Sequence, residues 1–190
     1  IISWALWHTR KGNSPSTKTV IIAALVMVPS GIVFARLFHV VDYPGYYLDH
    51  PERIVSLSGV SIYGAIAGAV LALWLFSKLR KFSFGWFVDM LTPAIIVGQA
   101  IGRVGCLTLG CCHGVETDLP WGIVYTNPLS VARLGIQYHP YPAYEIFILM
   151  LILAVVLWLR SRIKFKRDGT LFACYLAMYS IWRLSSGFIR

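Results

Sequence analysis

Long apolar segments dominate this chain, and their length restricts the folds that it can adopt. Hydrophobic residues make up 57% of its 190 residues, and the mean hydropathy is +0.68. The segments 19–41, 61–76, 84–102, 141–159 and 170–190 approach or reach the roughly 20 residues that a helix needs to cross a bilayer. The sequence therefore predicts an all-α fold, a polytopic transmembrane helical bundle.

The basic residues indicate how these helices are oriented. The formal charge is +9, and 11 of the 17 lysines and arginines lie in 10–18, 78–81 and 160–167, beside apolar runs. This is the positive-inside pattern of cytoplasmic loops, and it is not the basic footprint of a nucleic-acid-binding protein. Segments 42–59 and 105–138 then lie outside, and we expect the second, which is polar and rich in turns, to form an external lid or a re-entrant segment.

We expect a single membrane-embedded domain over residues 1–190. It would contain five complete or near-complete spans and, at residues 1–8, the tail of another span. Because the first residue is Ile1 and not Met, we expect the sequence to be cut short at its start, and no cleavable signal peptide is recognisable.

Segment 98–122 is the most chemically specific part of the chain. Gln99 and Arg103 are four residues apart, so they share one face of the predicted helix near its end. An arginine at the edge of the hydrocarbon is costly without a partner. We therefore expect Arg103 to bind an anion.

Glycines spaced four residues apart mark two of the predicted helices. Gly64 and Gly68 form one such pair, and Gly98 and Gly102 form the other. Small residues at this spacing allow another backbone to approach closely.

The final apolar segment carries a polar stripe. Its members recur at intervals of three and four residues and are Tyr175, Tyr179, Arg183, Ser186 and Arg190. Lipid would penalise such a stripe, so it should face protein or a water-filled cavity. The alternative to ligand binding is a structural pairing with Asp118, Glu116 or Glu145.

Under the positive-inside assignment, Arg36, Arg103 and Arg183 all come to the outer half of the membrane. A guanidinium offers a fork of donors that matches phosphate, so convergent arginines suit the headgroup of a lipid. For Arg36, snorkelling to the interface is an equally good interpretation. Tyr63 lies at the outer end of its helix, where an interfacial anchor is the commoner role.

The cysteines leave three interpretations open. Cys106, Cys111, Cys112 and the adjacent His113 could bind a metal, but they lack the paired Cys-x-x-Cys elements of common zinc modules. A disulfide in an oxidising compartment or free thiols are favoured instead, so we expect no metal and no cofactor. Cys174, alone in the last segment, is expected to be a small buried apolar residue.

Several motifs, taken together in their order and spacing, resemble the prolipoprotein diacylglyceryl transferase family over nearly the whole chain. They are Ala35-Arg36, 47–51, 63–68, Asp89 with Pro93, 98–105, 117–122, His139-Pro140, Tyr144-Glu145, and Arg183 with Arg190. The resemblance implies a multi-pass enzyme of the bacterial inner membrane, with its site on the periplasmic side. It would move the diacylglyceryl group of phosphatidylglycerol onto the lipobox cysteine of a prolipoprotein and release glycerol phosphate.

The resemblance also implies roles for residues. Arg103 and Arg183 match the family's essential arginines and would be catalytic by holding the phosphate, with Tyr63 as the third catalytic candidate. The residues expected to bind the phospholipid are Arg36, Gln99, Gly102, Gly114, Asp118, Tyr179 and Arg190. The expected partners are phosphatidylglycerol, a prolipoprotein signal peptide and membrane lipids, and no nucleic acid.

The chain departs from the family pattern at four positions. Tyr63 replaces a histidine, Cys106 an asparagine, Cys111 a glutamate, and Gly187 the glutamate that follows the last essential arginine. One alternative is therefore a catalytically altered relative that binds an anionic phospholipid as an accessory subunit of a larger membrane complex. Another is a related enzyme with a different acceptor or lipid, in which the cysteines take part.

Overall fold

The computed structural model describes residues 16–55, 59–163 and 167–188 and confirms an all-α membrane architecture. The described chain divides into two compact units. We call residues 16–84 the helix-pair unit and residues 85–188 the three-helix unit. The predicted helix tail at 1–8 lies outside the described residues.

The helix-pair unit consists of two long helices and a short helical connection. The elements are α2 (Thr17–Asp42), α3 (Pro44–Asp49), the 3-10 helix η1 (Pro51–Arg53) and α4 (Ile62–Arg80). The predicted spans 19–41 and 61–76 are thus confirmed as α2 and α4. The predicted outer loop 42–59 is partly helical, and Tyr47 is buried against His39, whose Nδ1 lies 3.0 Å from its hydroxyl.

Two glycines allow α2 and α4 to pack closely. A Cβ atom at Gly68 would lie 2.5 Å from the Cβ of Phe34, and one at Gly64 would lie 2.7 Å from the Cβ of Phe38. Ser30 also donates a 3.0 Å hydrogen bond to the carbonyl of Gly68. The small-residue face predicted for this helix is confirmed, since any larger side chain would push the helices apart.

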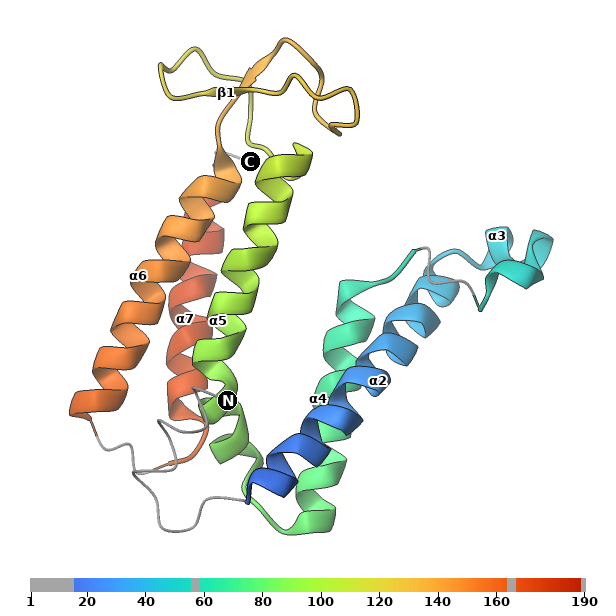
Figure 1. Ribbon diagram of the computed structural model, residues 1–190, viewed down its shortest axis with the longest axis vertical. Coiled ribbons are helices and arrows are strands. Elements are labelled where there is room, and N and C mark those ends of the chain that lie inside the picture. The colour runs from blue at the N-terminus through green and yellow to red at the C-terminus, as the bar shows by residue number, and fades with distance from the viewer. Residues whose placement is uncertain (1–15, 56–58, 164–166, 189–190) are drawn as a thin grey trace. The chain divides into compact units, whose positions relative to one another are not determined.

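The three-helix unit contains α5 (Phe84–Leu109), α6 (Tyr141–Arg162) and α7 (Thr170–Ser185), followed by η2 (Ser186–Phe188). Figure 1 shows the three long helices side by side. Their shared core is apolar and includes Ile96, Ala100, Leu149, Ile152, Val156, Leu171 and Tyr175.

A buried carboxylate sets the direction of α7 in this unit. Asp89, near the start of α5, accepts 2.8 Å hydrogen bonds from the amides of Gly169 and Phe172 at the start of α7. These bonds satisfy amides that a helix N-terminus leaves unpaired, and the negative charge suits the helix dipole. Consequently α5 and α7 begin at the same end, and their C-termini meet the N-terminus of α6 at the other end.

Residues 110–140, here called the cap, cover that other end of the unit (Figure 1). Two short antiparallel strands, β1 (Ile123–Val124) and β2 (Gln137–Tyr138), hold the cap together around buried Tyr125 and Tyr138. The predicted lid began at residue 105, but α5 continues to Leu109. The helix ends there because Gly110 adopts φ +63°, and the amide of Cys111 bonds to the carbonyl of Cys106 at 3.1 Å, as in a Schellman motif.

Four of the described helices are long and apolar enough to cross a membrane: Lys18–Asp42, Ile62–Arg80, Phe84–Leu109 and Tyr141–Arg162. This confirms a multi-pass membrane protein. The fifth predicted span corresponds to α7, whose 16 residues are fewer than a straight crossing needs. The single-domain assignment stays a prediction.

Candidate functional site

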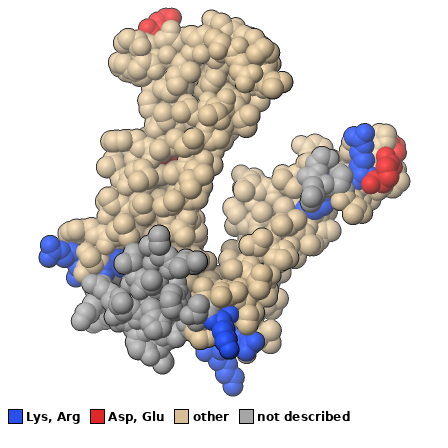
Figure 2. All heavy atoms as spheres, viewed as in Figure 1, with Lys and Arg blue, Asp and Glu red and all other residues tan. Residues whose placement is uncertain are grey.

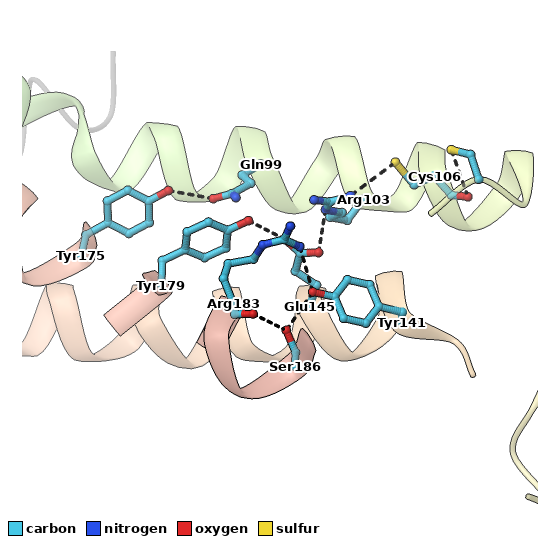
Figure 3. A network of polar contacts seen from close by, with 10 residues as sticks. Gln99, Arg103, Cys106, Tyr141, Glu145, Tyr175, Tyr179, Arg183 and Ser186 are labelled. Carbon is cyan, nitrogen blue, oxygen red and sulfur yellow. Dashed lines mark hydrogen bonds and ion pairs between the residues drawn. The ribbon is translucent and has the colours of Figure 1, made fainter. Parts of the chain in front are cut away.

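An ion pair joins α5 to α6 at the capped end of the three-helix unit. The Nε of Arg103 lies 2.8 Å from Oε2 of Glu145, whose side chain is 0% exposed. The hydroxyl of Tyr179 on α7 donates a 2.8 Å hydrogen bond to the other carboxylate oxygen (Figure 3). A buried charge is tolerated when it is paired and hydrogen-bonded. Here one carboxylate oxygen forms the ion pair with Arg103 and the other accepts the hydrogen bond from Tyr179.

The second arginine approaches the same helix one turn away. Arg183 of α7 donates a 2.9 Å hydrogen bond to the hydroxyl of Tyr141, which is 1% exposed and also lies 2.9 Å from the hydroxyl of Ser186. Tyr141 and Glu145 are four residues apart and therefore share one face of α6. Arg103 and Arg183, which the sequence placed on different helices, thus converge on that face (Figure 3).

The charges of this cluster do not balance. It contains the guanidinium groups of Arg103 and Arg183 and the single carboxylate of Glu145. In the described ranges Arg183 forms no ion pair with a carboxylate, and its guanidinium donates instead to the hydroxyl of Tyr141. A positive charge is expensive at membrane depth without compensation, so the cluster is suited to an anion.

The polar network continues along α5 in both directions. Tyr175 donates a 2.8 Å hydrogen bond to Oε1 of Gln99, and its ring stacks on that of Tyr179 with centroids 6.1 Å apart. On the other side, Nη1 of Arg103 lies 3.9 Å from the sulfur of Cys106. The described residues of the predicted α7 stripe therefore face protein, and Tyr179 pairs with Glu145, which was one of the structural partners considered for the stripe.

The glycine face of α5 is open. A Cβ atom added at Gly98, Gly102 or Gly105 would meet no atom within 4 Å. The three positions follow one another at helical spacing beside Arg103. Unlike the glycines of α4, these residues form a strip of helix next to the charged cluster that no other part of the three-helix unit covers.

Two predicted site residues belong to the helix-pair unit. The guanidinium of Arg36 donates to the backbone carbonyls of Ile54 at 2.8 Å, Gly59 at 2.6 Å and Arg53. These bonds tie the connection between α3 and α4 back to α2. Tyr63, near the start of α4, is 78% exposed.

Gly114 and Asp118 lie in the cap. Gly114 is buried, and its amide donates to the carbonyl of His139 at 3.0 Å, so its role there is to hold the cap together. Asp118 is exposed and, in the described part of the chain, makes no hydrogen bond or ion pair with the arginine cluster. Arg190 lies outside the described residues.

Three cysteines gather where α5 enters the cap. The sulfurs of Cys106, Cys111 and Cys112 lie within 4.8 Å of one another, and all four cysteines of the chain are free in the structure. Burial, aided by the neighbouring thiols, raises the pKa of Cys111 to about 11, so this thiol is protonated at neutral pH. His113 is not part of the group: its ring packs on Tyr138 with centroids 4.0 Å apart.

Two central residues of the cluster were not among the predicted site residues. Glu145 was considered only as a structural partner, although a carboxylate in an apolar segment of crossing length is itself a signal of a functional site. Tyr141 carries no comparable signal, because tyrosines at the ends of membrane helices are common anchors.

Comparison with known proteins identifies the chain's relatives. A family profile described as prolipoprotein diacylglyceryl transferase matches residues 1–190. Proteins named phosphatidylglycerol–prolipoprotein diacylglyceryl transferase are similar to it. The one from Dehalococcoides mccartyi is 42% identical over 190 residues, which cover 100% of this chain and 72% of the relative.

Two more distant relatives carry the same name. The one from Clostridium tetani is 32% identical over 168 residues, covering 88% of this chain and 66% of the relative. The one from Trichormus variabilis is 36% identical over 167 residues, covering 83% and 59%. The match over the whole chain confirms the resemblance read from the motifs, and the chain belongs to the prolipoprotein diacylglyceryl transferase family.

Proposed function

We propose that this chain is the enzyme that transfers the diacylglyceryl group of phosphatidylglycerol to the lipobox cysteine thiol of a prolipoprotein. The reaction is inferred from membership of the family, and the name of the relatives mentions both phosphatidylglycerol and the prolipoprotein. The candidate site is assigned from one observation: Arg103 and Arg183 converge on one face of α6, where, among the described residues, Glu145 is the one carboxylate and pairs with Arg103.

The charge of the cluster fits the lipid. Phosphatidylglycerol carries one negative charge on its phosphodiester, and two guanidinium groups with one carboxylate leave one positive charge in excess. When the thiol attacks the glyceryl carbon, the carbon–oxygen bond breaks and negative charge grows on the phosphate. Arginine donors aimed at that phosphate stabilise the transition state more than the ground state.

Arg103 and Arg183 differ in how many of their donors are available to bind the phosphate. Glu145 engages Nε of Arg103 and orients its guanidinium, and Nη1 of the same group lies 3.9 Å from the sulfur of Cys106. Arg183 is oriented by a single bond to Tyr141 and has no carboxylate partner among the described residues. We assign the main phosphate contact to Arg183, a supporting contact to Arg103, and positioning roles to Glu145, Tyr141 and Tyr179.

The open glycine strip suits a lipid substrate. Gly98, Gly102 and Gly105 leave the surface of α5 uncovered beside Arg103. An acyl chain could lie against this strip while the headgroup reaches the arginines. In this proposal Gly102 and Gln99 line the lipid path, whereas Gly114 and Asp118 shape the cap above it.

The site belongs on the periplasmic side of the membrane. In the three-helix unit, α6 ends in Arg160 and Arg162, and α7 starts shortly after Arg167. Figure 2 shows blue lysine and arginine atoms at this lower end of the unit, opposite the cap. Since basic ends stay in the cytoplasm, the cap and the arginine cluster face the opposite side, where prolipoprotein substrates emerge.

A transfer assay tests this proposal. Vesicles containing the chain, labelled phosphatidylglycerol and a lipobox peptide should form a thioether-linked lipopeptide. Arg103→Ala should lower kcat/KM by about 100-fold or more, because an oriented charge is lost from the transition state. Arg133→Ala is the matched control, since Arg133 is an exposed arginine of the cap with no part in the cluster. Absence of product from the unaltered chain would refute the assignment.

A further inference from the structure

The three-cysteine group at the junction of α5 and the cap has no role in the function proposed above. The sulfurs of Cys106, Cys111 and Cys112 come from one helix end and the turn that follows it, and they lie within 4.8 Å of one another. Four tetrahedral thiolates around zinc at about 2.3 Å have sulfurs about 3.8 Å apart. Shifts of an ångström or less would therefore bring the three cysteines into a metal-binding geometry.

The backbone is bent in a way that makes this group possible. Gly110 and Cys112 both have left-handed conformations, with φ +63° and φ +56°. A left-handed cysteine is unusual, and backbone strain of this kind is retained where the surrounding structure or a function requires it. Here the two left-handed residues reverse the chain after α5, so that Cys111 and Cys112 turn back toward Cys106.

We propose that Cys106, Cys111 and Cys112 bind a zinc ion whose fourth position receives the acceptor thiol of the prolipoprotein. Three cysteine thiolates are a soft ligand set that zinc prefers. In the described ranges no histidine, aspartate or glutamate completes the group. Three protein ligands and an open position are the pattern of a catalytic zinc site, whereas structural sites are closed by four.

The location connects this site to the proposed phosphate clamp. Nη1 of Arg103 lies 3.9 Å from the sulfur of Cys106 (Figure 3). A thiolate on a metal bonded to Cys106 and a phosphate held by Arg103 would thus be neighbours. This part of the inference rests on the proposed function.

The chemistry balances without an oxidant or reductant. Each of the three cysteines loses a proton to solvent when zinc binds, and the acceptor thiol loses one when it takes the fourth position. Its sulfur forms a bond to the glyceryl carbon, while the carbon–oxygen bond breaks and its electron pair goes to the phosphate oxygen. The thioether product is a weaker ligand than a thiolate and therefore leaves the metal. Glycerol phosphate, the other product, leaves the arginines. This supplies the thiolate that transfer to a thiol requires.

Metal binding is tested directly and independently of activity. The purified chain, stripped with a chelator and reloaded, should hold a single zinc ion, and cobalt should give the intense d–d bands of a tetrahedral thiolate site. Cys174→Ser is the matched control, because Cys174 lies on α7 outside the group, and it should bind fully. Cys106→Ser should lose the metal while its helix content stays unchanged. No stoichiometric metal in the unaltered chain, or full binding by Cys106→Ser, would overturn the site.

The open position is tested with a lipobox peptide. Adding the peptide should shift the cobalt d–d bands, and a peptide with serine at the acceptor position should not. An unchanged spectrum would overturn the assignment of the fourth position. Transfer by the metal-free chain would overturn the zinc inference and leave the proposed function standing. Metal binding with a thiol-dependent shift but no transfer would support the site and count against the proposed function.

Discussion

The arginines near the helix ends of the two units have different kinds of partners for their charge. In the helix-pair unit, Arg36 directs its donors at backbone carbonyls of the connection that follows α3. In the three-helix unit, Arg103 and Arg183 contact side chains of α6, and within the described ranges Arg103 has a carboxylate partner whereas Arg183 has none. An arginine near the end of a membrane helix therefore does not identify a ligand site; the type and charge of its partners do.

The glycines of the two units differ in the same manner. Atoms of α2 occupy the space beside Gly64 and Gly68, whereas no atom lies within 4 Å of a Cβ placed at Gly98 or Gly102. The spacing is identical in both helices. The first pair lets α2 and α4 pack closely, and in the proposed function the second pair is available to a lipid.

The largest expected effect on stability follows from removing the carboxylate of Glu145 in the three-helix unit. Glu145→Ala leaves the partly buried guanidinium of Arg103 without its partner. Breaking a fully buried pair costs about 3–5 kcal/mol of stability, and the loss here should approach that range from below because the side chain of Arg103 is 18% exposed. Thermal unfolding in detergent, followed by circular dichroism, would measure the loss. Glu145→Gln, which keeps the volume and the hydrogen-bond acceptor for Tyr179, should lose less. An unchanged stability of Glu145→Gln would mean that the charge of Glu145 is unimportant.

Arg183→Ala is expected to have the largest effect on catalysis. Loss of one oriented donor to the transition state costs about 10²–10³-fold in rate, or about 2.7–4 kcal/mol. Arg183→Lys keeps the charge and should recover only part of the activity, because an ammonium cannot form the bidentate contact. Steady-state transfer kinetics would measure both variants. A normal rate in Arg183→Ala would remove the distinction between the two kinds of arginine.

Alanine substitutions in the two glycine pairs should have opposite effects on stability, of intermediate size. Gly68→Ala places a Cβ atom against Phe34 and Ser30 of α2, and overpacking of this kind costs about 1–3 kcal/mol. Gly102→Ala meets no neighbour, and alanine favours the helix by about 1 kcal/mol over glycine. Unfolding temperatures should therefore fall for the first variant and stay level or rise for the second. The reverse order would contradict the assignment of packed and open faces.

Arg36→Gln should have the smallest effect. It removes hydrogen bonds to carbonyls that solvent can partly replace, so the stability loss should be about 1–2 kcal/mol. Transfer activity at a temperature where the variant is folded should fall by less than about tenfold. A loss as large as that of Arg183→Ala would show that Arg36 also contacts the phosphate, as the sequence suggested.

Much of the fold was predictable because the bilayer imposes a simple rule. Apolar runs of crossing length at 19–41, 61–76, 84–102 and 141–159 became the four long helices. The end of α5 was misplaced, since polar composition suggested a break at Gly105. The break occurs at Gly110, where the left-handed backbone ends the helix.

The sequence alone determined the membrane architecture, the family and the two arginines of the candidate site, because these depend on hydropathy and on short motifs with fixed spacing. The tertiary structure alone revealed that Glu145 and Tyr141 receive those arginines, that Asp89 caps α7, and that three cysteine sulfurs meet. These facts depend on which helix faces touch and on backbone reversals such as that at Cys112. Contacts between residues far apart in sequence arise only when the chain is folded, because spacing along one helix fixes a face but not its partner.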